Sequence, residues 1–429
     1  MAEVTMSPVN DSAELLARRQ RVLGQGYRLF YQEPLHPVRG EGVWLFDAQG
    51  KRYLDVYNNV ASVGHCHPAV VEAIARQSAQ LNTHTRYLHH AIVDFAEDLL
   101  REFPPELDNL MLTCTGSEAN DLALRIARHV TGGTGVIVTR WAYHGVTSAL
   151  AELSPSLGDG VARGNYVKLI DAPDNYRQPG AFLASVQSAL AEMRAEGIRP
   201  AALLFDTIFS SDGVFSPPAG EVAQAVQWVR DAGGLFIADE VQPGFGRTGE
   251  AMWGFARHQV VPDLVSLGKP MGNGHPIAGL VGKSALFAAF GRDVRYFNTF
   301  GGNPVSCQAA HAVLRVIREE QLQQNALRVG HCLREGLQAL AQRHELLGDV
   351  RGSGLFVGAE LVSDREHKTP ASAEAVAVVN TMRQRGVLIS ATGPAGNILK
   401  IRPPLVFREE HAALFLDTLD AVLTDVAQR

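Results

Sequence analysis

Lys269 is the one charged residue in the glycine-rich segment 264–274 (LVSLGKPMGNG), directly after a predicted strand. Burial in a tight turn lowers the pKa of an amine and lets it act as a nucleophile, although a lysine in such a turn is more often a surface side chain. Upstream, Asp239 ends the apolar run 235–238. Open α/β sheets bind ligands at this end of a strand, so Asp239 is a candidate site residue, with helix capping or metal binding as the alternatives.

The segment 115–120 (TGSEAN) joins a predicted strand to a predicted helix. Gly116 permits close approach to the backbone, and Ser117 is expected to cap the helix. Free N–H groups and the positive end of the helix suit a phosphate, although ordinary capping alone explains such a pattern more often. Tyr143 follows the next predicted strand, where an aromatic side chain can cover a planar ring.

Together, these residues supply a phosphate cup, an aromatic cover, a carboxylate and a lysine in the order of the predicted sheet. Pyridoxal 5'-phosphate needs these four parts. Lys269 would bond to the aldehyde of the cofactor. Asp239 would keep the pyridine nitrogen protonated, because a nearby opposite charge favours the charged form, and a protonated ring is the stronger electron sink.

Short apolar runs alternate with helical segments between 110 and 281, which is typical of a parallel sheet covered on both faces. The sequence therefore predicts an α/β fold with a large, doubly wound, mostly parallel sheet and a smaller α+β domain. We expect residues 1–60, with a hairpin at 42–56, to belong to the small domain. We assign 61–304 to the large cofactor-binding domain and 305–429 to the C-terminal small domain, which is expected to share its sheet with the hairpin.

The predicted elements follow from periodicity and turn residues. Strands are expected at 110–114, 136–139, 167–170, 202–206, 235–239, 264–267, 277–281 and 387–390. Helices are expected at 68–81, 92–102, 117–129, 182–196, 221–232, 305–320, 323–344, 373–385 and 409–426.

The composition argues against several classes of protein. The 429 residues carry 39 basic and 45 acidic side chains, a net charge of −6, so no overall basic field points to nucleic acid or an anionic membrane. No apolar run approaches the roughly 18 residues of a membrane span. The start of the chain is polar and acidic (Glu3, Asp11, Glu14), unlike a signal peptide. We expect a cytoplasmic protein whose four scattered cysteines are buried, reduced thiols.

Three other motifs are expected to be unrelated to function. The glycines at 244, 246 and 249 match a dinucleotide fingerprint, but a glycine at 254 makes a poor helix opening there. The segment 282–284 (GKS) lacks the first glycine of a phosphate-binding loop. The pairs at 65–67 (HCH) and 89–90 (HH) lack partner clusters, so we expect structural histidines and no metal.

Beyond these residues, the chain resembles the class III aminotransferase type of fold type I pyridoxal-phosphate enzymes from about Gly42 to the C-terminus. The resemblance rests on five segments: 115–120 (TGSEAN), 143–145 (YHG), 238–249 (ADEVQPGFGRTG), 268–276 (GKPMGNGHP) and 297–304 (FNTFGGNP).

The resemblance implies a role for each matching residue. Lys269 would be the Schiff-base lysine and proton shuttle, and Asp239 would pair with the ring nitrogen. A neighbouring subunit would complete the site, which implies a homodimer with shared sites, possibly assembled further into a tetramer. The other implied contacts are Gly116, Ser117 and the neighbour's Thr299 with the phosphate, Tyr143 and Val241 with the two ring faces, and Gln242 with the ring hydroxyl.

Within the family, the segments 57–60 (YNNV), 63–68 (VGHCHP), 81–89 (LNTHTRYLH) and 269–276 (KPMGNGHP) resemble the ethanolamine-phosphate phospho-lyase branch. Alanine–glyoxylate type aminotransferases share part of this pattern. We take Asn59, in the first of these segments, as a candidate substrate residue.

Many class III aminotransferases carry a glutamate that pairs with a mobile arginine. Ser211 stands at the matching position here, so Arg402 would be unpaired and free to bind an anionic group of the substrate. A structural ion pair is the alternative role for Arg402.

Three functions are compatible with these residues. A lyase would eliminate phosphate and ammonia from O-phosphoethanolamine, or from a related phosphorylated or phosphonate amine, and give acetaldehyde. An ω-amino-acid or amine aminotransferase would start with the same proton removal. A pyridoxal-phosphate-sensing regulator would need a DNA-binding domain, and the roughly 40 residues before the hairpin leave no room for one.

Overall fold

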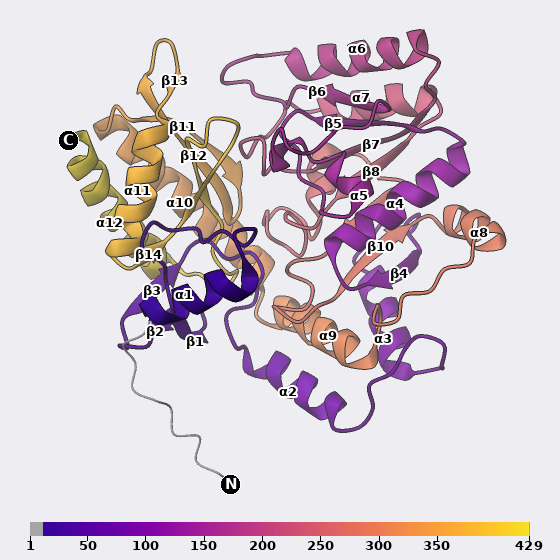
Figure 1. Ribbon diagram of the computed structural model, residues 1–429, viewed down its shortest axis with the longest axis horizontal. Coiled ribbons are helices and arrows are strands. Elements are labelled where there is room, and N and C mark those ends of the chain that lie inside the picture. Colours follow the sequence, from indigo (N-terminus) through magenta and orange to yellow (C-terminus); the bar gives the residue numbers. More distant parts are fainter. Residues whose placement is uncertain (1–11, 429) are drawn as a thin grey trace.

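The computed structural model describes residues 12–428, so the prediction for the first residues, including Glu3 and Asp11, lies outside the described chain. Its largest sheet has seven strands in the order β4-β10-β9-β8-β7-β5-β6 (Figure 1). Strands β5 to β9 run parallel, and β10 is antiparallel to both of its neighbours. The bounds are β4 Asn109–Thr113, β5 Gly135–Thr139, β6 Val167–Ile170, β7 Pro200–Asp206, β8 Leu235–Asp239, β9 Leu264–Leu267 and β10 Ala278–Gly282.

Helices cover both faces of this sheet, as the apolar strands predict. Val136 and Val138 belong to a core cluster with one face of α4 (Gly116–Thr131), whereas Ile137 belongs to the cluster that includes side chains of α6 (Ala181–Ala195) and α7 (Glu221–Asp231). The α/β fold class is confirmed, with one antiparallel strand inside an otherwise parallel sheet.

Two smaller sheets confirm the predicted shared sheet for one C-terminal strand and correct it for the others. The N-terminal strands pair with β14 (Val387–Leu388), but the strands near 350 and 356 lie in a separate sheet with β15 (Ser390–Thr392). The chain crosses between the two sheets at Ile389, which the prediction placed inside one continuous strand. The other members are β1 Pro37–Glu41, β2 Trp44–Asp47 and β3 Arg52–Asp55 in the first sheet, and β11 Leu347–Ser353, β12 Phe356–Asp364, β13 Thr369–Pro370 and β16 Ile398–Ile401 in the second.

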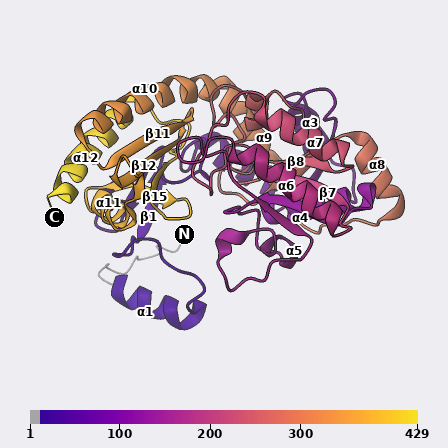
Figure 2. The same cartoon turned by 90° about the horizontal axis from the view of Figure 1, so that it is seen from above.

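The remaining helices join these sheets. α9 packs against α2 and α3, and α10 packs against α12 and β11. Figure 2 shows α1 standing apart from the sheets, and no residue of α1 is buried. Their bounds are α1 Ser12–Leu23, α2 Pro68–Ser78, α3 His90–Leu100, α5 Ser148–Ala151, α8 Ser284–Asp293, α9 Pro304–Glu319, α10 Leu322–Arg343, α11 Ser372–Gln384 and α12 Glu409–Ala427.

The expectation of four buried thiols is wrong for Cys66, which is exposed in the turn before α2, although all four cysteines are free. Cys307 is buried, and Cys114 and Cys332 are half-buried. Within residues 12–428, no helix is both long and apolar enough to span a bilayer.

Candidate active site

The carboxyl ends of the parallel strands bring the predicted residues to one edge of the large sheet. Asp239 ends β8, Asp206 stands opposite it at the end of β7, and Lys269 follows β9. These residues line a cavity of about 110 Å3 together with Thr115, Gly116, Ser117, Asn120, Tyr143, His144, Gly145, Val241 and Gln242. Seven of the predicted site residues therefore meet in one place: Lys269, Asp239, Gly116, Ser117, Tyr143, Val241 and Gln242.

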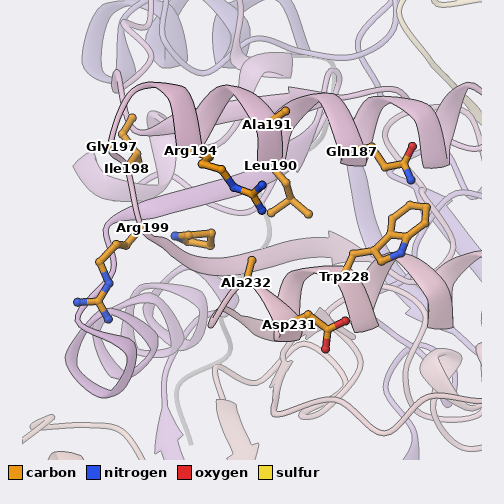
Figure 3. A pocket seen from close by; sticks show the side chains of 11 residues that line it. Gln187, Leu190, Ala191, Arg194, Gly197, Ile198, Arg199, Trp228, Asp231 and Ala232 are labelled. Carbon is orange, nitrogen blue, oxygen red and sulfur yellow. The ribbon is translucent and has the colours of Figure 1, made fainter.

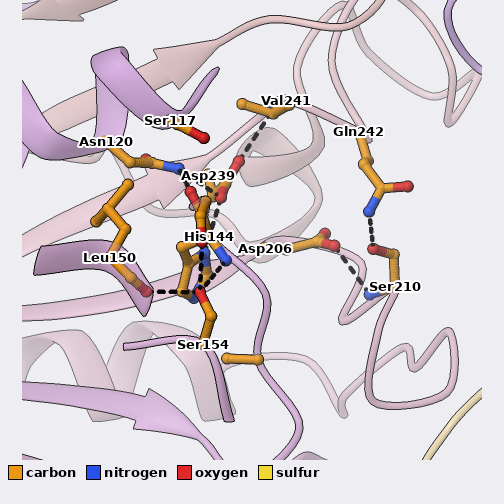
Figure 4. A network of polar contacts seen from close by, with 12 residues as sticks. Ser117, Asn120, His144, Leu150, Ser154, Asp206, Ser210, Asp239, Val241 and Gln242 are labelled. Atoms are coloured by element: carbon orange, nitrogen blue, oxygen red, sulfur yellow. Dashed lines mark hydrogen bonds and ion pairs between the residues drawn. The ribbon is translucent and has the colours of Figure 1, made fainter. Parts of the chain in front are cut away.

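Asp239 is buried and fully engaged in hydrogen bonds (Figure 4). Its Oδ2 accepts from Asn120 Nδ2 at 2.9 Å and contacts His144 Nδ1 at 2.8 Å, and its Oδ1 accepts from the N–H of Val241 at 3.1 Å. Burial raises the pKa of the carboxyl, but the His144, Val241 and Asn120 hydrogen bonds outweigh it, so the pKa lies below its ordinary value. Asp239 is therefore held as an anion, which is the form that pairs with a protonated ring nitrogen.

Lys269 is positioned as a reactive amine. Burial, followed by the nearby Arg402 guanidinium, lowers its pKa below the ordinary value, although Asp239 and Asp206 act in the opposite direction. Its Nζ lies 5.9 Å from the ring centroid of Tyr143. Among residues 12–428, no hydrogen bond or ion pair involves Nζ, so the amine is available to a ligand in the cavity.

The start of α4 corrects one detail of the predicted phosphate cup. Thr115, not Ser117, is the N-cap: its Oγ1 accepts from the N–H of Glu118 at 3.1 Å, and the Glu118 carboxylate accepts from the N–H of Thr115 at 3.0 Å. This reciprocal pair needs a spacing of three residues, which Ser117 could not provide with an acidic partner. Within the described chain, the N–H groups of Gly116 and Ser117 have no partner, so they remain available to a phosphate.

Close packing around Val241 explains the glycines of the site. A Cβ at Gly116 would lie 2.9 Å from Val241 Cγ2, and a Cβ at Gly268 would lie 3.1 Å from its Cγ1. A Cβ at Gly145 would lie 2.6 Å from Ser117 Oγ. A side chain at any of these three positions would crowd the cavity, and the free N–H groups, the anionic carboxylate and the lysine of lowered pKa fit pyridoxal phosphate.

Gln242 lines the cavity, whereas Arg402 and Asn59 contact Gln242 without lining it. Gln242 Nε2 donates to Ser210 Oγ at 2.6 Å, and its Oε1 accepts from Arg402 Nη1. Arg402 makes no ion pair with a carboxylate among residues 12–428, and burial lowers its pKa. Asn59 is buried, and its Nδ2 donates to the carbonyl of Gln242 at 3.0 Å.

The sequence suggested a free Arg402, and this is wrong. The neutral side-chain amide of Gln242 accepts a hydrogen bond from it. The structural ion pair considered as its alternative role is not present in the described chain either. Ser211 brings no carboxylate to the site, and its carbonyl accepts from the N–H of Gly393 at 3.2 Å.

Sequence reasoning missed four residues of this region. Asn120 and His144 lie within the motifs at 115–120 and 143–145, and Asp206 ends a predicted strand just as Asp239 does. Lys400, in β16, precedes Arg402 by two residues, is buried, and has its pKa lowered well below the ordinary value by burial and then by Arg402. Its two-residue spacing from Arg402 could have indicated it, because side chains two residues apart in an extended segment point to the same side.

Thr299 is exposed and does not line this cavity. It belongs to a segment with exposed aromatic side chains, Phe297 and Phe300. Phe297 contacts His84 with ring centroids 5.8 Å apart, so the segments 84–88 and 297–300 adjoin one another. A role for Thr299 in a neighbouring subunit remains a prediction.

A larger hollow of about 710 Å3 lies between α6 and α7 (Figure 3), away from the predicted site residues. Its charged side chains, Arg194, Arg199 and Asp231, form no cluster with a nucleophile or a metal-binding set. The predicted structural histidines have protein partners: His65 contacts Asp55 at 2.6 Å, and His89 caps α3.

Comparison with known proteins agrees with this geometry. The family model for class III aminotransferases matches residues 30–423. The chain belongs to the class III aminotransferase family. Enzymes of this family depend on pyridoxal phosphate, and the residues that line the cavity at the edge of the large sheet fit this cofactor.

Three relatives within the class III aminotransferase family span nearly the whole chain. The Drosophila melanogaster alanine–glyoxylate aminotransferase 2-like protein is 44% identical, over 97% of this chain and 88% of that protein. The Caenorhabditis elegans ethanolamine-phosphate phospho-lyase homolog 1 is 37% identical, over 99% and 96%. A solved Arthrobacter phospholyase in complex with phosphoethanolamine is 47% identical, with a TM-score of 0.93 over 96% and 99% of the two chains.

Proposed function

We propose that this class III enzyme is a phospho-lyase that converts O-phosphoethanolamine and water to acetaldehyde, ammonia and inorganic phosphate. The observation that carries the proposal is Arg402, a half-buried guanidinium with no carboxylate partner in the described chain, beside Lys269. An anionic substrate group would supply the missing partner. The phosphoethanolamine bound to the Arthrobacter phospholyase supports this substrate.

The residues of the site divide the work of this reaction. Pyridoxal phosphate, when bound, supplies an electron sink that makes the proton on the amine-bearing carbon acidic. Lys269 removes that proton at Nζ, and burial favours this role because it lowers the pKa of the amine. Asp239 holds a proton on the ring nitrogen through its negative charge, and Arg402 orients the phosphate on the neighbouring carbon for departure.

Holding the phosphate also directs the outcome toward elimination. The substrate phosphate leaves from the carbon next to the one that Lys269 deprotonates, so bound substrate needs no second proton transfer to the cofactor before phosphate departs. Water then completes the reaction by releasing acetaldehyde and ammonia. No keto acid enters this sequence.

An amine:keto-acid aminotransferase is the second candidate. The identity of 44% to the alanine–glyoxylate aminotransferase 2-like protein of Drosophila favours it over any unrelated activity. The two candidates share Lys269, Asp239 and the cofactor site, and they differ in whether an amino acceptor is needed.

The shared-site homodimer is part of the same proposal. Leu88 is fully exposed in the single chain, and Phe300 has 70% of its surface exposed. Both adjoin the segment that carries Thr299, so burying them against a second copy would bring Thr299 to the partner's cofactor phosphate. The tetramer and the cytoplasmic location stay predictions from the sequence.

Phosphate release without any keto acid tests the function. We expect purified holoenzyme to release many equivalents of phosphate per site from O-phosphoethanolamine, because elimination leaves the cofactor ready for the next substrate. Release that stops at one equivalent, together with steady turnover of a simple amine when pyruvate is added, would establish the aminotransferase instead.

A further inference from the structure

The side-chain amide of Gln242 joins two groups that lie far apart in the sequence. Nε2 donates to Ser210 Oγ at 2.6 Å, and Oε1 accepts from Arg402 Nη1. We refer to these three residues as the Ser210–Gln242–Arg402 chain. Gln242 and Ser210 are both buried, so water cannot readily replace either hydrogen bond.

Ser210 is itself fixed by its surroundings. Its N–H donates to Asp206 Oδ2 at 2.9 Å, and its carbonyl accepts from Thr392 Oγ1 at 3.1 Å. These contacts anchor the loop that follows β7 to both the large sheet and the smaller sheet. The hydroxyl is thereby held where it accepts from Gln242.

The guanidinium of Arg402, which can only donate, determines which way the Gln242 amide points, and the fixed Ser210 hydroxyl holds the other end of that amide. With Nε2 bound to Ser210, Oε1 is the atom that faces Arg402. A flipped amide would turn its NH2 group toward the guanidinium, and two donors would then oppose one another. The arrangement also leaves Arg402 with spare donors, because its Nε is buried and has no partner among residues 12–428.

We propose that Ser210 and Gln242 hold Arg402 in place through an uncharged acceptor that an anionic substrate group displaces. Gln242 is thus a specificity residue, and Ser210 is a positioning residue that acts through it. The inference rests on the anion-binding role of Arg402 proposed above.

An uncharged acceptor suits this task for a physical reason. Arg402 needs an acceptor before substrate binds, because the guanidinium is half-buried and an unpartnered cation there is unfavourable. A carboxylate partner would weaken anion binding, because an incoming anion would have to break one ion pair of Arg402 in order to form another. The amide keeps Arg402 oriented while preserving most of its attraction for a negative charge.

Two substitutions and a control test the chain. Gln242→Glu places a carboxylate beside Arg402, Ser210→Ala removes the hydroxyl that holds the amide, and Ser185→Ala removes a half-buried hydroxyl on α6 that bonds the N–H of Asp171 at 2.9 Å. For each holoenzyme, dissociation constants for O-phosphoethanolamine and ethanolamine are measured from the rapid change in cofactor absorbance on mixing. The two amines differ only in the phosphate.

We expect Gln242→Glu to weaken the binding of O-phosphoethanolamine about ten- to a hundredfold and the binding of ethanolamine less than about threefold. Ser210→Ala should weaken O-phosphoethanolamine about three- to tenfold with little effect on ethanolamine, and Ser185→Ala should change neither. If Gln242→Glu does not retain cofactor, the test rests on Ser210→Ala, in which the ratio of the dissociation constants for O-phosphoethanolamine and ethanolamine should rise.

Equal weakening of both amines, or an unchanged ratio in both variants, would overturn the inference. The measurement precedes turnover, so it separates this inference from the proposed function. A shifted ratio in an enzyme that releases no phosphate would refute the lyase and leave the chain standing. If the enzyme releases phosphate over many turnovers but the ratio of the two dissociation constants is unchanged in the variants, the lyase stands and the role of the Ser210–Gln242–Arg402 chain is refuted.

Discussion

The two ends of the active site are built in different ways. The cofactor end, which we define as the start of α4 with Asp239 and Lys269, is made from strand ends of one sheet. The substrate end, defined as Ser210, Gln242 and Arg402, joins loops of the large sheet to the residue that directly follows β16 of a smaller sheet. One end therefore depends on local motifs, and the other depends on how separate parts of the chain pack.

A four-residue segment links the two ends. Asp239 belongs to the cofactor end and Gln242 to the substrate end, and Glu240 between them points away, toward Thr207. Its carboxyl also accepts from the N–H groups of Gly254 and Phe255, each at 2.7 Å. Because one anchored segment serves both ends, substitutions at the two ends should differ in which kinetic constant they change.

The largest effect is expected at the cofactor end. Lys269→Ala should lower kcat by at least about 10³-fold, because both the covalent partner and the proton-transfer group are lost. Borohydride treatment of the wild type followed by peptide mapping should place the cofactor on Lys269. Lys168→Ala, which removes an ion pair with Glu196 at the edge of the sheet, is the control and should retain activity. An adduct on another lysine would refute the assignment.

Asp239→Asn should retain cofactor but lower kcat about 10- to 10³-fold, because the ring nitrogen loses a charge that shifts its pKa by one to three units. Cofactor content from absorbance and kcat under saturating substrate are the measurements. Near wild-type turnover in a variant that holds a full complement of cofactor would contradict the role of this carboxylate.

Arg402→Ala should change KM and leave kcat nearly unchanged, in contrast to the substitutions at the cofactor end. Losing a charge-assisted hydrogen bond costs about 1.5–3 kcal/mol, so KM for O-phosphoethanolamine should rise roughly ten- to a hundredfold. KM for a neutral amine and kcat should change much less. If KM rises alike for neutral and anionic amines, Arg402 has a structural role and the division into two ends is wrong.

The smallest effect concerns the segment between the ends. Burial raises the pKa of Glu240 from 4.5 to about 8 in the folded protein. Between these values the folded state binds a proton that the unfolded state has lost, so this group makes the free energy of unfolding fall as pH rises, by at most about 1.4 kcal/mol per pH unit. Glu240→Gln should remove this contribution.

Urea unfolding of both proteins at pH 6 and pH 8 measures the difference. The wild type should lose stability relative to Glu240→Gln over this interval, because only the wild type must give up the proton. Parallel changes in the two proteins would show that Glu240 ionises as freely in the folded state as in the unfolded chain.

The sequence by itself determined the cofactor end. Apolar runs fixed the strands, and the carboxyl ends of parallel strands share one edge, so Asp239, Lys269 and the start of α4 had to meet. The motifs then implied Tyr143 and Val241, both of which line the cavity. The same reasoning could have found Asp206, which ends β7 in register with Asp239.

Only the tertiary structure decided the substrate end and the helix cap. Arg402 is 160 residues from Gln242 in the chain, and no periodicity relates the two. Whether this guanidinium meets a carboxylate, an amide or open space depends on the packing of two sheets, and that packing placed Gln242 there. The cap likewise depended on which hydroxyl faced the free N–H groups, and backbone geometry chose Thr115 over Ser117. Local residue types determine which chemistry a chain can perform, whereas long-range packing determines which partner each buried charge receives.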